Sequence, residues 1–345
     1  MSSMPTTVRI HQLGEPLPPA LEVEPAHLSP KAQEEVKAMM RSDPAGFFST
    51  LALAWISVAA AIALAVWAQH AAVSIAAILF IGTRQNILGL LIHEQSHRLG
   101  LASKLGDHLT NLFCAFPLLI TMEGYRRVHL KHHKFYFTDH DPDYLRKQGK
   151  EWTFPQKARH FVAMLIKDLV GMNIVRNFKG KRVDADAGRE FRGTPMWARL
   201  IEYGAIATAL TLTGTWVYFL LYWLLPLLTV MQVIVRWGAI CEHKYNLINP
   251  TLGESTPMIQ PRWWEMLILP NLNFNLHIYH HWYPAIPFRK LPQVHRLYQR
   301  EGLVKEQNMF RGYVAFLKSL LSPKAPAAAA TQSQDSAPMV RKDAA

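Results

Sequence analysis

Apolar residues are concentrated in a few long runs along the chain. The first two runs, about Leu51–Gln69 and Ala71–Ile92, each approach the roughly 20 residues that a helix needs to cross a bilayer. Only His70 and its neighbours separate them, which is too short a link for anything but a tight hairpin. The pattern therefore predicts two antiparallel transmembrane helices.

A second pair of apolar runs follows later in the chain. We expect spans over Leu200–Tyr222 and Trp223–Ala239, with an uncharged turn near Leu221–Pro226. Aromatic residues near the ends of these runs, including Trp197 and Trp216, are typical of the membrane interface. The expected fold is an all-α integral membrane protein with four transmembrane helices in two hairpins.

Basic segments indicate how these hairpins are oriented. Lys31, Lys37 and Arg41 precede the first pair of runs, and the polar segment 98–199 that follows it is rich in Lys and Arg. Because basic residues stay on the cytosolic side, the outer ends of the hairpins should face the cytosol. The polar segments would then form a cytosolic helical cap.

Three shorter helices are predicted in these segments. Ser29 and Pro30 suit the N-cap and first position of a helix over about Pro30–Met40. The apolar stretch Leu109–Met122 is too short to span and favours a re-entrant or interfacial helix. Phe161–Phe178 mixes apolar and basic residues, as an amphipathic helix on a membrane surface does.

The chain divides into three parts. Residues 1–45 form a cytosolic segment that we expect to be partly disordered, with no visible signal peptide. Residues 46–321 form the membrane domain. Residues 322–345 contain Ala-Pro repeats and are expected to be a disordered tail.

Composition and charge narrow the possible functions. The formal charge of +12 could indicate nucleic-acid binding, but the basic residues lie beside apolar spans. An anionic membrane surface is the expected partner, and nucleic acid is not. The chain has two cysteines, Cys114 and Cys241, so neither a disulfide framework nor a thiolate cluster is indicated. Metal ligands must therefore be nitrogen or oxygen atoms.

Histidines gather in three clusters, which we call box one, box two and box three. Box one is His93-Glu94-Gln95-Ser96-His97, at the cytosolic end of the second apolar run. On a helix its two imidazoles leave the same face and can reach one metal. Taken alone, it also matches the H-E-x-x-H pattern of zinc proteases, with Glu94 as general base.

Box two and box three share one spacing. Box two begins at His129 and box three at His277, and each has histidines at i, i+3 and i+4, within an arc of about 100° on a helix. Eight boxed histidines are too many for one zinc ion, so the boxes predict two metals. Outside the boxes we expect these histidines to be structural: His11, His27, His70, His108, His140, His160 and His295.

The boxes, their order and the hairpins resemble the membrane fatty acid desaturase/hydroxylase family over about Leu51–Leu303. The resemblance implies a non-haem centre of two iron ions, held in the cytosolic cap, that activates O2 and attacks an unactivated C–H bond. It also implies a water-mediated or outer role for Asn273, four residues before box three. The implied metal ligands are His93, His97, His129, His132, His133, His243, His277, His280 and His281.

The resemblance also bears on the substrate. Box one has three residues between its histidines, as in enzymes that act on acyl lipids, rather than the four typical of acyl-CoA Δ9 enzymes. We expect a fatty acyl chain or lipid, drawn from the bilayer into an apolar tunnel. Trp282, Tyr283 and the Leu109–Leu119 helix are candidate walls, although plain packing explains each one more simply.

No redox domain is visible in the sequence, so electrons should come from a ferredoxin- or rubredoxin-like protein with its reductase. A basic stretch could dock such an acidic partner, or could equally face solvent or lipid. This stretch contains Arg126, Arg127, Lys131 and Lys134. We expect a multi-pass protein of a bacterial inner membrane, with its metal site on the cytosolic side.

Carboxylates follow box two over Asp139–Asp143. They could bear on the metal site. A turn that ends in a helix cap explains them more simply.

Three classes of function remain open. The motif match favours an O2-dependent di-iron lipid oxidase: a desaturase first, with a hydroxylase, a ketolase or a decarboxylase that makes terminal alkenes on the same scaffold. The boxes do not separate these reactions. A membrane zinc protease would leave six boxed histidines unexplained. A non-enzymatic metal carrier should have more charged residues within its spans than Arg84 and Glu202.

Overall fold

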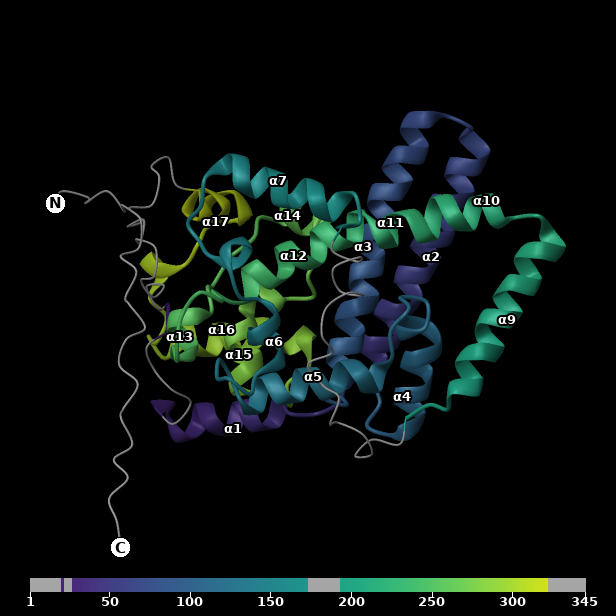
Figure 1. The fold of residues 1–345 in the computed structure, drawn as a ribbon. Helices are drawn as coiled ribbons and strands as arrows, with labels where there is room; N and C mark the ends of the chain where they lie inside the picture. The colour runs from purple at the N-terminus through teal and green to yellow at the C-terminus, as the bar shows by residue number, and fades with distance from the viewer. Residues whose placement is uncertain (1–19, 22–26, 173–192, 322–345) are drawn as a thin grey trace, which may run out of the picture.

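The computed structural model describes residues 20–21, 27–172 and 193–321, which form helices joined by loops, with two isolated β-bridges and no strand. The predicted tail and most of the predicted N-terminal segment lie outside these residues. The all-α prediction is confirmed for the described part of the chain (Figure 1). Its α-helices are α1 (Pro30–Met39), α2 (Pro44–Ala68), α3 (Ala71–Ser96), α4 (Lys104–Thr110), α5 (Met122–Lys134), α6 (Pro142–Arg146), α7 (Ala158–Leu169), α9 (Met196–Thr213), α10 (Trp216–Phe219), α11 (Leu225–Leu228), α12 (Val230–Glu242), α13 (Leu252–Ser255), α14 (Trp263–Ile268), α15 (His277–Trp282), α16 (Leu291–Arg300) and α17 (Tyr313–Leu320). Short π- and 3-10 segments cover Asn111–Ala115, Lys150–Trp152, Leu220–Leu224, Phe274–Leu276, Phe288–Lys290 and Glu306–Asn308.

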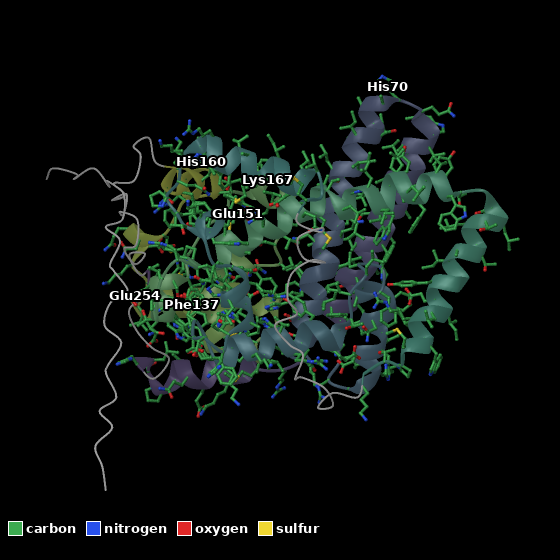
Figure 2. All side chains as sticks on the ribbon, viewed as in Figure 1. His70, Phe137, Glu151, His160, Lys167 and Glu254 are labelled. Atoms are coloured by element: carbon green, nitrogen blue, oxygen red, sulfur yellow. The ribbon has the colours of Figure 1, made fainter. Side chains whose placement is uncertain are left out.

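The first hairpin forms as predicted, and local capping explains its turn. α2 ends where Gln69 adopts a left-handed backbone conformation with φ 48°, and the His70 side chain then caps α3 by accepting a hydrogen bond from Ala72 N. Figure 2 shows His70 at the outer tip of this hairpin. Both helices are long and apolar enough to cross a membrane. α3 continues past the predicted end at Ile92 to Ser96 and so carries box one.

The predicted boundaries of the second pair are wrong. The chain turns at Gly214, whose φ of 65° ends α9, rather than near Leu221–Pro226. It then continues as one helical segment over Trp216–Glu242, which is long and apolar enough to cross a membrane. Leu220–Leu224 is π-helical, and Pro226 lies just after it in the interior of this segment, where proline has no N–H to donate to a carbonyl of the preceding turn.

Helix α9 stands apart from the other helices (Figure 1). None of its residues is buried, and Arg199 and Tyr203 attach it by hydrogen bonds to the carbonyls of Leu119 and Phe116. Within the described ranges, three segments are long and apolar enough to span a membrane, and α9 is not among them. α9 has only 18 residues and these include Arg199 and Glu202, so a fourth span stays a prediction.

The three shorter helices are confirmed in part. α1 begins after Ser29, whose side chain caps it as predicted. The stretch Leu109–Met122 is helical only to Ala115, after which the chain turns before α5. α7 covers the predicted amphipathic helix only from Phe161 to Leu169, because the chain turns at Gly171, whose φ is 75°, and residues 173–178 lie outside the described part of the chain.

Three apolar cores support the boxes. The first, which we call the membrane core, joins α2, α3 and the third candidate span, Trp216–Glu242, to the start of α5, and it includes Ile92 and Met122. A second core packs α1 and α16 around Ile278 and Tyr279 of α15. A third joins α7, α12 and α17 and includes Cys241. Each core contains chain neighbours of candidate metal ligands, so packing of the cores fixes where the histidines lie.

A buried ion pair attaches α7 to the third span. Arg236 donates hydrogen bonds to both carboxylate oxygens of Asp168, and the two side chains are 4% and 0% exposed. Replacing Asp168 by Ala should lower the free energy of unfolding by about 3–5 kcal/mol, because it removes both hydrogen bonds to a buried guanidinium and leaves it only the more distant carboxylate of Glu151, 3.6 Å away. Thermal unfolding in detergent measures this loss.

The matched control is the exposed pair of Arg300 and Glu35, whose side chains are 55% and 38% exposed. Glu35→Ala should cost at most about 1 kcal/mol, since solvent screens the pair. Equal losses from both substitutions would contradict the importance of the buried pair.

Candidate metal centre

Four helices bring the predicted ligands to one place. Box one lies at the C-terminal end of α3, box two on the last turns of α5 and box three on α15, while His243 is the C-cap of α12. Contacts between rings connect all nine predicted histidines into one cluster. These boxes are far apart in sequence, so the tertiary fold alone creates the site.

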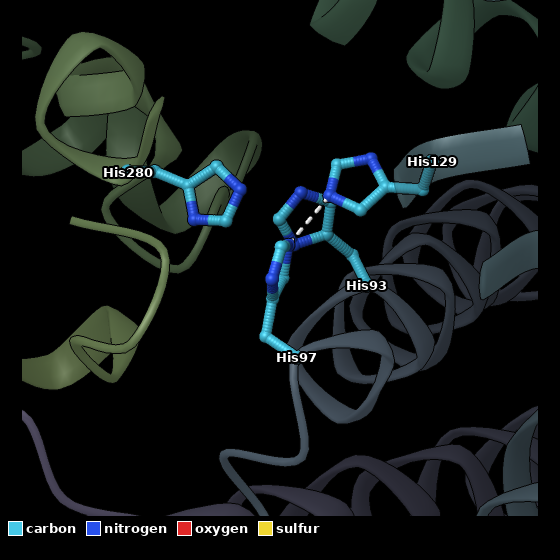
Figure 3. A group of neighbouring side chains, drawn as sticks. All are labelled: His93, His97, His129 and His280. Carbon is cyan, nitrogen blue, oxygen red and sulfur yellow. Dashed lines mark hydrogen bonds between the residues drawn. The ribbon is translucent and has the colours of Figure 1, made fainter. Parts of the chain in front are cut away.

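The first group contains His93, His97, His129 and His280, whose possible ligand atoms lie within 4.8 Å of one another. Figure 3 shows these rings converging from α3, α5 and α15. The Nε2 atoms of His97 and His129 are 2.8 Å apart. His133 borders this group, with its Nε2 3.1 Å from that of His129 and 3.0 Å from that of His280.

The second group contains His132, His243 and His281. The Nε2 atom of His243 lies 3.3 Å from that of His132 and 3.1 Å from that of His281. His277 borders this group, 3.1 Å from His281 between Nε2 atoms. The rings of His133 and His281 stack with centroids 4.3 Å apart, so the two groups are direct neighbours.

This arrangement fits metal ions. Two nitrogens bound at a right angle, each about 2.1 Å from one ion, are about 3.0 Å apart, close to the Nε2 separations observed here. His93 is buried, and neither of its ring nitrogens has a hydrogen-bond partner among the described residues. A buried polar atom without a partner is costly unless something binds it. Imidazole nitrogens are suitable ligands for iron.

Burial also favours the neutral form of most of these imidazoles. Burial, together with the nearby charge of Arg126, lowers the pKa of His97 to about 4. Burial, with the neighbouring His97 and His132, lowers the pKa of His133 to about 2. A neutral ring retains the lone pair that a metal requires. Burial likewise lowers the pKa values of His129, His243, His277, His280 and His281.

Two further residues hold candidate ligands in place and were not predicted. Asp141 accepts a hydrogen bond from Nδ1 of His132 at 2.8 Å, and the hydroxyl of Tyr136 lies 3.1 Å from Nδ1 of His243. The helix cap predicted within Asp139–Asp143 is confirmed, because Asp141 caps α6. The only sequence signal for the histidine contact was a carboxylate close to box two.

Arg126 was placed on a basic stretch that faces a partner, solvent or lipid, and its exposure is wrong. Its side chain is buried, donates two hydrogen bonds of 2.6 Å to Asp107 and also binds the carbonyls of Gln95 and Ser96. It therefore fixes the end of α3 immediately before His97. Arg126 and Asp107 pair because α4 packs against α5. The pattern of basic residues around Arg126 does not reveal this packing.

Asn273 lies next to box three, but its side chain donates a hydrogen bond to the Phe288 carbonyl at 3.1 Å. No described contact joins it to a box histidine, so a water-mediated role stays a prediction. Phe274, which was not predicted, packs its ring against His93 with centroids 4.4 Å apart. It belongs to the membrane core and extends that core to the first group.

Two of the candidate tunnel walls, Trp282 and Tyr283, pack against Tyr298 of α16, and the third, Leu109–Leu119, contributes Cys114, Ala115 and Leu118 to the membrane core. Trp282 stacks on Tyr298 with ring centroids 5.8 Å apart, and the hydroxyls of Tyr283 and Tyr298 are 2.7 Å apart. These contacts agree with the simpler packing interpretation. His140 also lies away from the cluster, with a side chain that is 72% exposed.

Comparison with known proteins gives one family. The family model described as fatty acid desaturase matches residues 68–312, which include all nine candidate ligands. No curated protein sequence matches the chain.

The lowered pKa values predict that metal binding resists mild acid. Between pH 7 and pH 6, four histidines of ordinary pKa 6.5 would lose about a hundredfold in metal affinity to protonation. The affinity of the metal-free protein should instead change by less than about threefold, because His97 and its neighbours stay neutral over this range. Competition with a chelator of known affinity at each pH measures the change.

The same shifts affect the stability of the metal-free fold. Because the folded-state pKa values are depressed, stability is fully present above about pH 6.5 and falls as the unfolded chain takes up protons below it. Tenfold or greater weakening of metal binding at pH 6, with the fold intact, would contradict the neutral cluster.

Proposed function

The chain belongs to the fatty acid desaturase family, and from this premise we propose that it is a di-iron desaturase. It would use O2 to remove hydrogen from an unactivated C–H bond of a fatty acyl chain. The observation that carries this proposal is the pair of adjacent histidine groups, since a single-metal enzyme needs only one. Hydroxylation, ketolation and decarboxylation to a terminal alkene are variants of the same chemistry.

Each histidine group would hold one iron ion. The first iron would be bound by the group of His93 with His133 at its border, and the second by the group of His132 with His277 at its border. When bound, the two ions would supply the chemistry that activates O2 and oxidises the substrate. The residues around them keep the imidazoles neutral, oriented and shielded from water.

The membrane core suggests how the substrate approaches. Ile92, Met122 and Phe274 belong to the same apolar core as α2 and α3, and Phe274 contacts His93. An acyl chain that follows this core from the bilayer would meet the first histidine group. Holding one methylene there would turn oxidation into a proximity-controlled reaction at a fixed chain position.

We also propose that the protein lies in a bacterial inner membrane with its metal site on the cytosolic side. A ferredoxin- or rubredoxin-like protein with its reductase would supply the electrons. Box one lies at the opposite end of α3 from the His70 turn, next to the basic segments. Lys134 is exposed at the end of α5 and is available to an acidic donor protein, whereas Arg126 is buried and is not available.

The contacts of Glu94 argue against a zinc protease. Its carboxylate is buried and accepts a hydrogen bond from Phe288 N at 3.0 Å, and it belongs to neither histidine group. A protease base must reach the water bound to the metal. Glu94 instead attaches the end of α3 to the loop after box three.

Replacing Glu94 by Gln should therefore preserve O2-dependent lipid oxidation to within about threefold, because the amide oxygen still accepts from Phe288 and the metal groups are untouched. Product yield per iron in reconstituted membranes measures this. Complete loss of activity in a folded, metal-loaded variant would favour the H-E-x-x-H base.

Product analysis tests the function directly. Membranes containing the protein, chain-deuterated fatty acids and phospholipids, O2 and the electron-donor pair should yield an acyl chain with a new double bond by mass spectrometry. An added oxygen atom would indicate a hydroxylase or ketolase, and a volatile terminal alkene would indicate a decarboxylase. Zinc instead of iron, with no O2-dependent product from any lipid, would overturn the proposal.

Vesicle orientation tests the sidedness in the same assay. The donor proteins cannot cross a membrane, so inside-out vesicles should form product and right-side-out vesicles should not. The opposite result would place the metal site on the external face.

A further inference from the structure

The loop after box two contains a carboxylate whose hydrogen-bonding capacity is fully used. Asp141 is 0% exposed, and its Oδ2 accepts from His132 Nδ1 at 2.8 Å and Phe137 N at 3.0 Å. Its Oδ1 accepts from Asp143 N at 2.9 Å and Tyr144 N at 3.1 Å. A carboxylate offers about four acceptor positions, so this one has none left for a metal. Its contact with His132 must act through the imidazole.

That contact determines which nitrogen of His132 is free. A carboxylate only accepts hydrogen bonds, so the proton of the neutral imidazole is assigned to Nδ1. Nε2 then carries the lone pair, and it is the atom that lies 3.3 Å from Nε2 of His243 in the second group. The carboxylate also makes the ring a stronger electron donor to a metal.

The backbone of this loop is held in an unfavourable conformation that allows the contact. Phe137 has φ 55°, in the left-handed region that bulky residues rarely adopt. Its N–H binds Asp141, and its ring is buried and stacks on Tyr245 with centroids 5.6 Å apart. Strain maintained by surrounding contacts is often found at functional sites.

The two histidine groups differ in how many of their ring nitrogens are held by hydrogen bonds. In the second group, Nδ1 of His243 also has oxygen partners, the hydroxyl of Tyr136 at 3.1 Å and that of Thr256 at 3.3 Å. In the first group, His93 has no partner at either nitrogen within the described part of the chain, whereas at the border of the second group His277 lacks one at Nδ1 alone. The second group is therefore better oriented before any metal binds.

We propose that Asp141 is a positioning residue that makes the second group, His132, His243 and His281, the tighter of two unequal metal sites. This inference rests on the proposed di-iron function, but it concerns the order and strength of metal binding. The first ion bound should enter the second group. The first group, with its less restrained rings, should fill afterwards.

The experiment is anaerobic titration of the full-length, metal-free protein in detergent with Fe2+, followed by chelator competition and by Mössbauer spectra of bound 57Fe. The wild type should bind two ions in two resolved steps. Asp141→Asn should weaken the tighter step by about 10–100-fold, the usual effect of losing such a partner, and alter one of two iron signals. The weaker step should stay unchanged.

Asp139→Asn is the matched control, because Asp139 lies in the same loop with a side chain that is 85% exposed. It should bind both ions as the wild type does. Equal weakening of both steps in Asp141→Asn, or no weakening in a folded variant, would overturn the inference. A wild type that binds no pair of ions would instead overturn the di-iron function.

Tyr136→Phe provides a second test should Asp141→Asn misfold. It removes one hydroxyl from His243 and leaves the loop backbone intact. It should weaken only the tighter metal-binding step, and the loss of affinity should be smaller than for Asp141→Asn. A change confined to the weaker step would contradict the assignment.

Discussion

The structure depends on the burial of many neutral imidazoles in one place. Ring nitrogens of the three boxes and His243 lie about 3 Å apart, close enough that protonation of one disfavours protonation of the next. Exclusion of water and mutual proximity both favour the uncharged rings. A cluster of this kind would be a poor core for a protein without metal, because its polar atoms have too few partners. The surrounding cores compensate by fixing every helix that contributes a ring.

Each box is fixed by contacts just beyond its helix end. Arg126 holds the end of α3 by donating hydrogen bonds to the carbonyls of Gln95 and Ser96, and it also pairs with Asp107. Asp141 holds the loop after α5 through its contact with His132. Glu94 joins box one to the loop that follows box three. These buried polar contacts cross between elements, so they couple the boxes to one another as well as to the cap.

The sequence predicted what local patterns control. Continuous apolar runs identified the first hairpin, and repeated spacings identified eight histidines that the fold brings together, while the family resemblance added His243. The turn at Gly214 was missed because the apolar run has no charge to mark its boundary and Pro226 resembled a break. The roles of Arg126 and Asp141 were missed because each depends on a partner brought close by the tertiary fold. A charged side chain can be buried because such a partner is present, and the composition of the chain does not reveal that partner.

The backbone at Asn273 changes how the residues before box three should be interpreted. Leu272 and Asn273 both have positive φ, 48° and 64°, and asparagine adopts this region far more readily than most residues. The turn that starts the box three segment is thus sufficient reason for an asparagine there. An asparagine at this position is therefore not by itself a sign of a metal ligand, since the backbone of the turn already favours it.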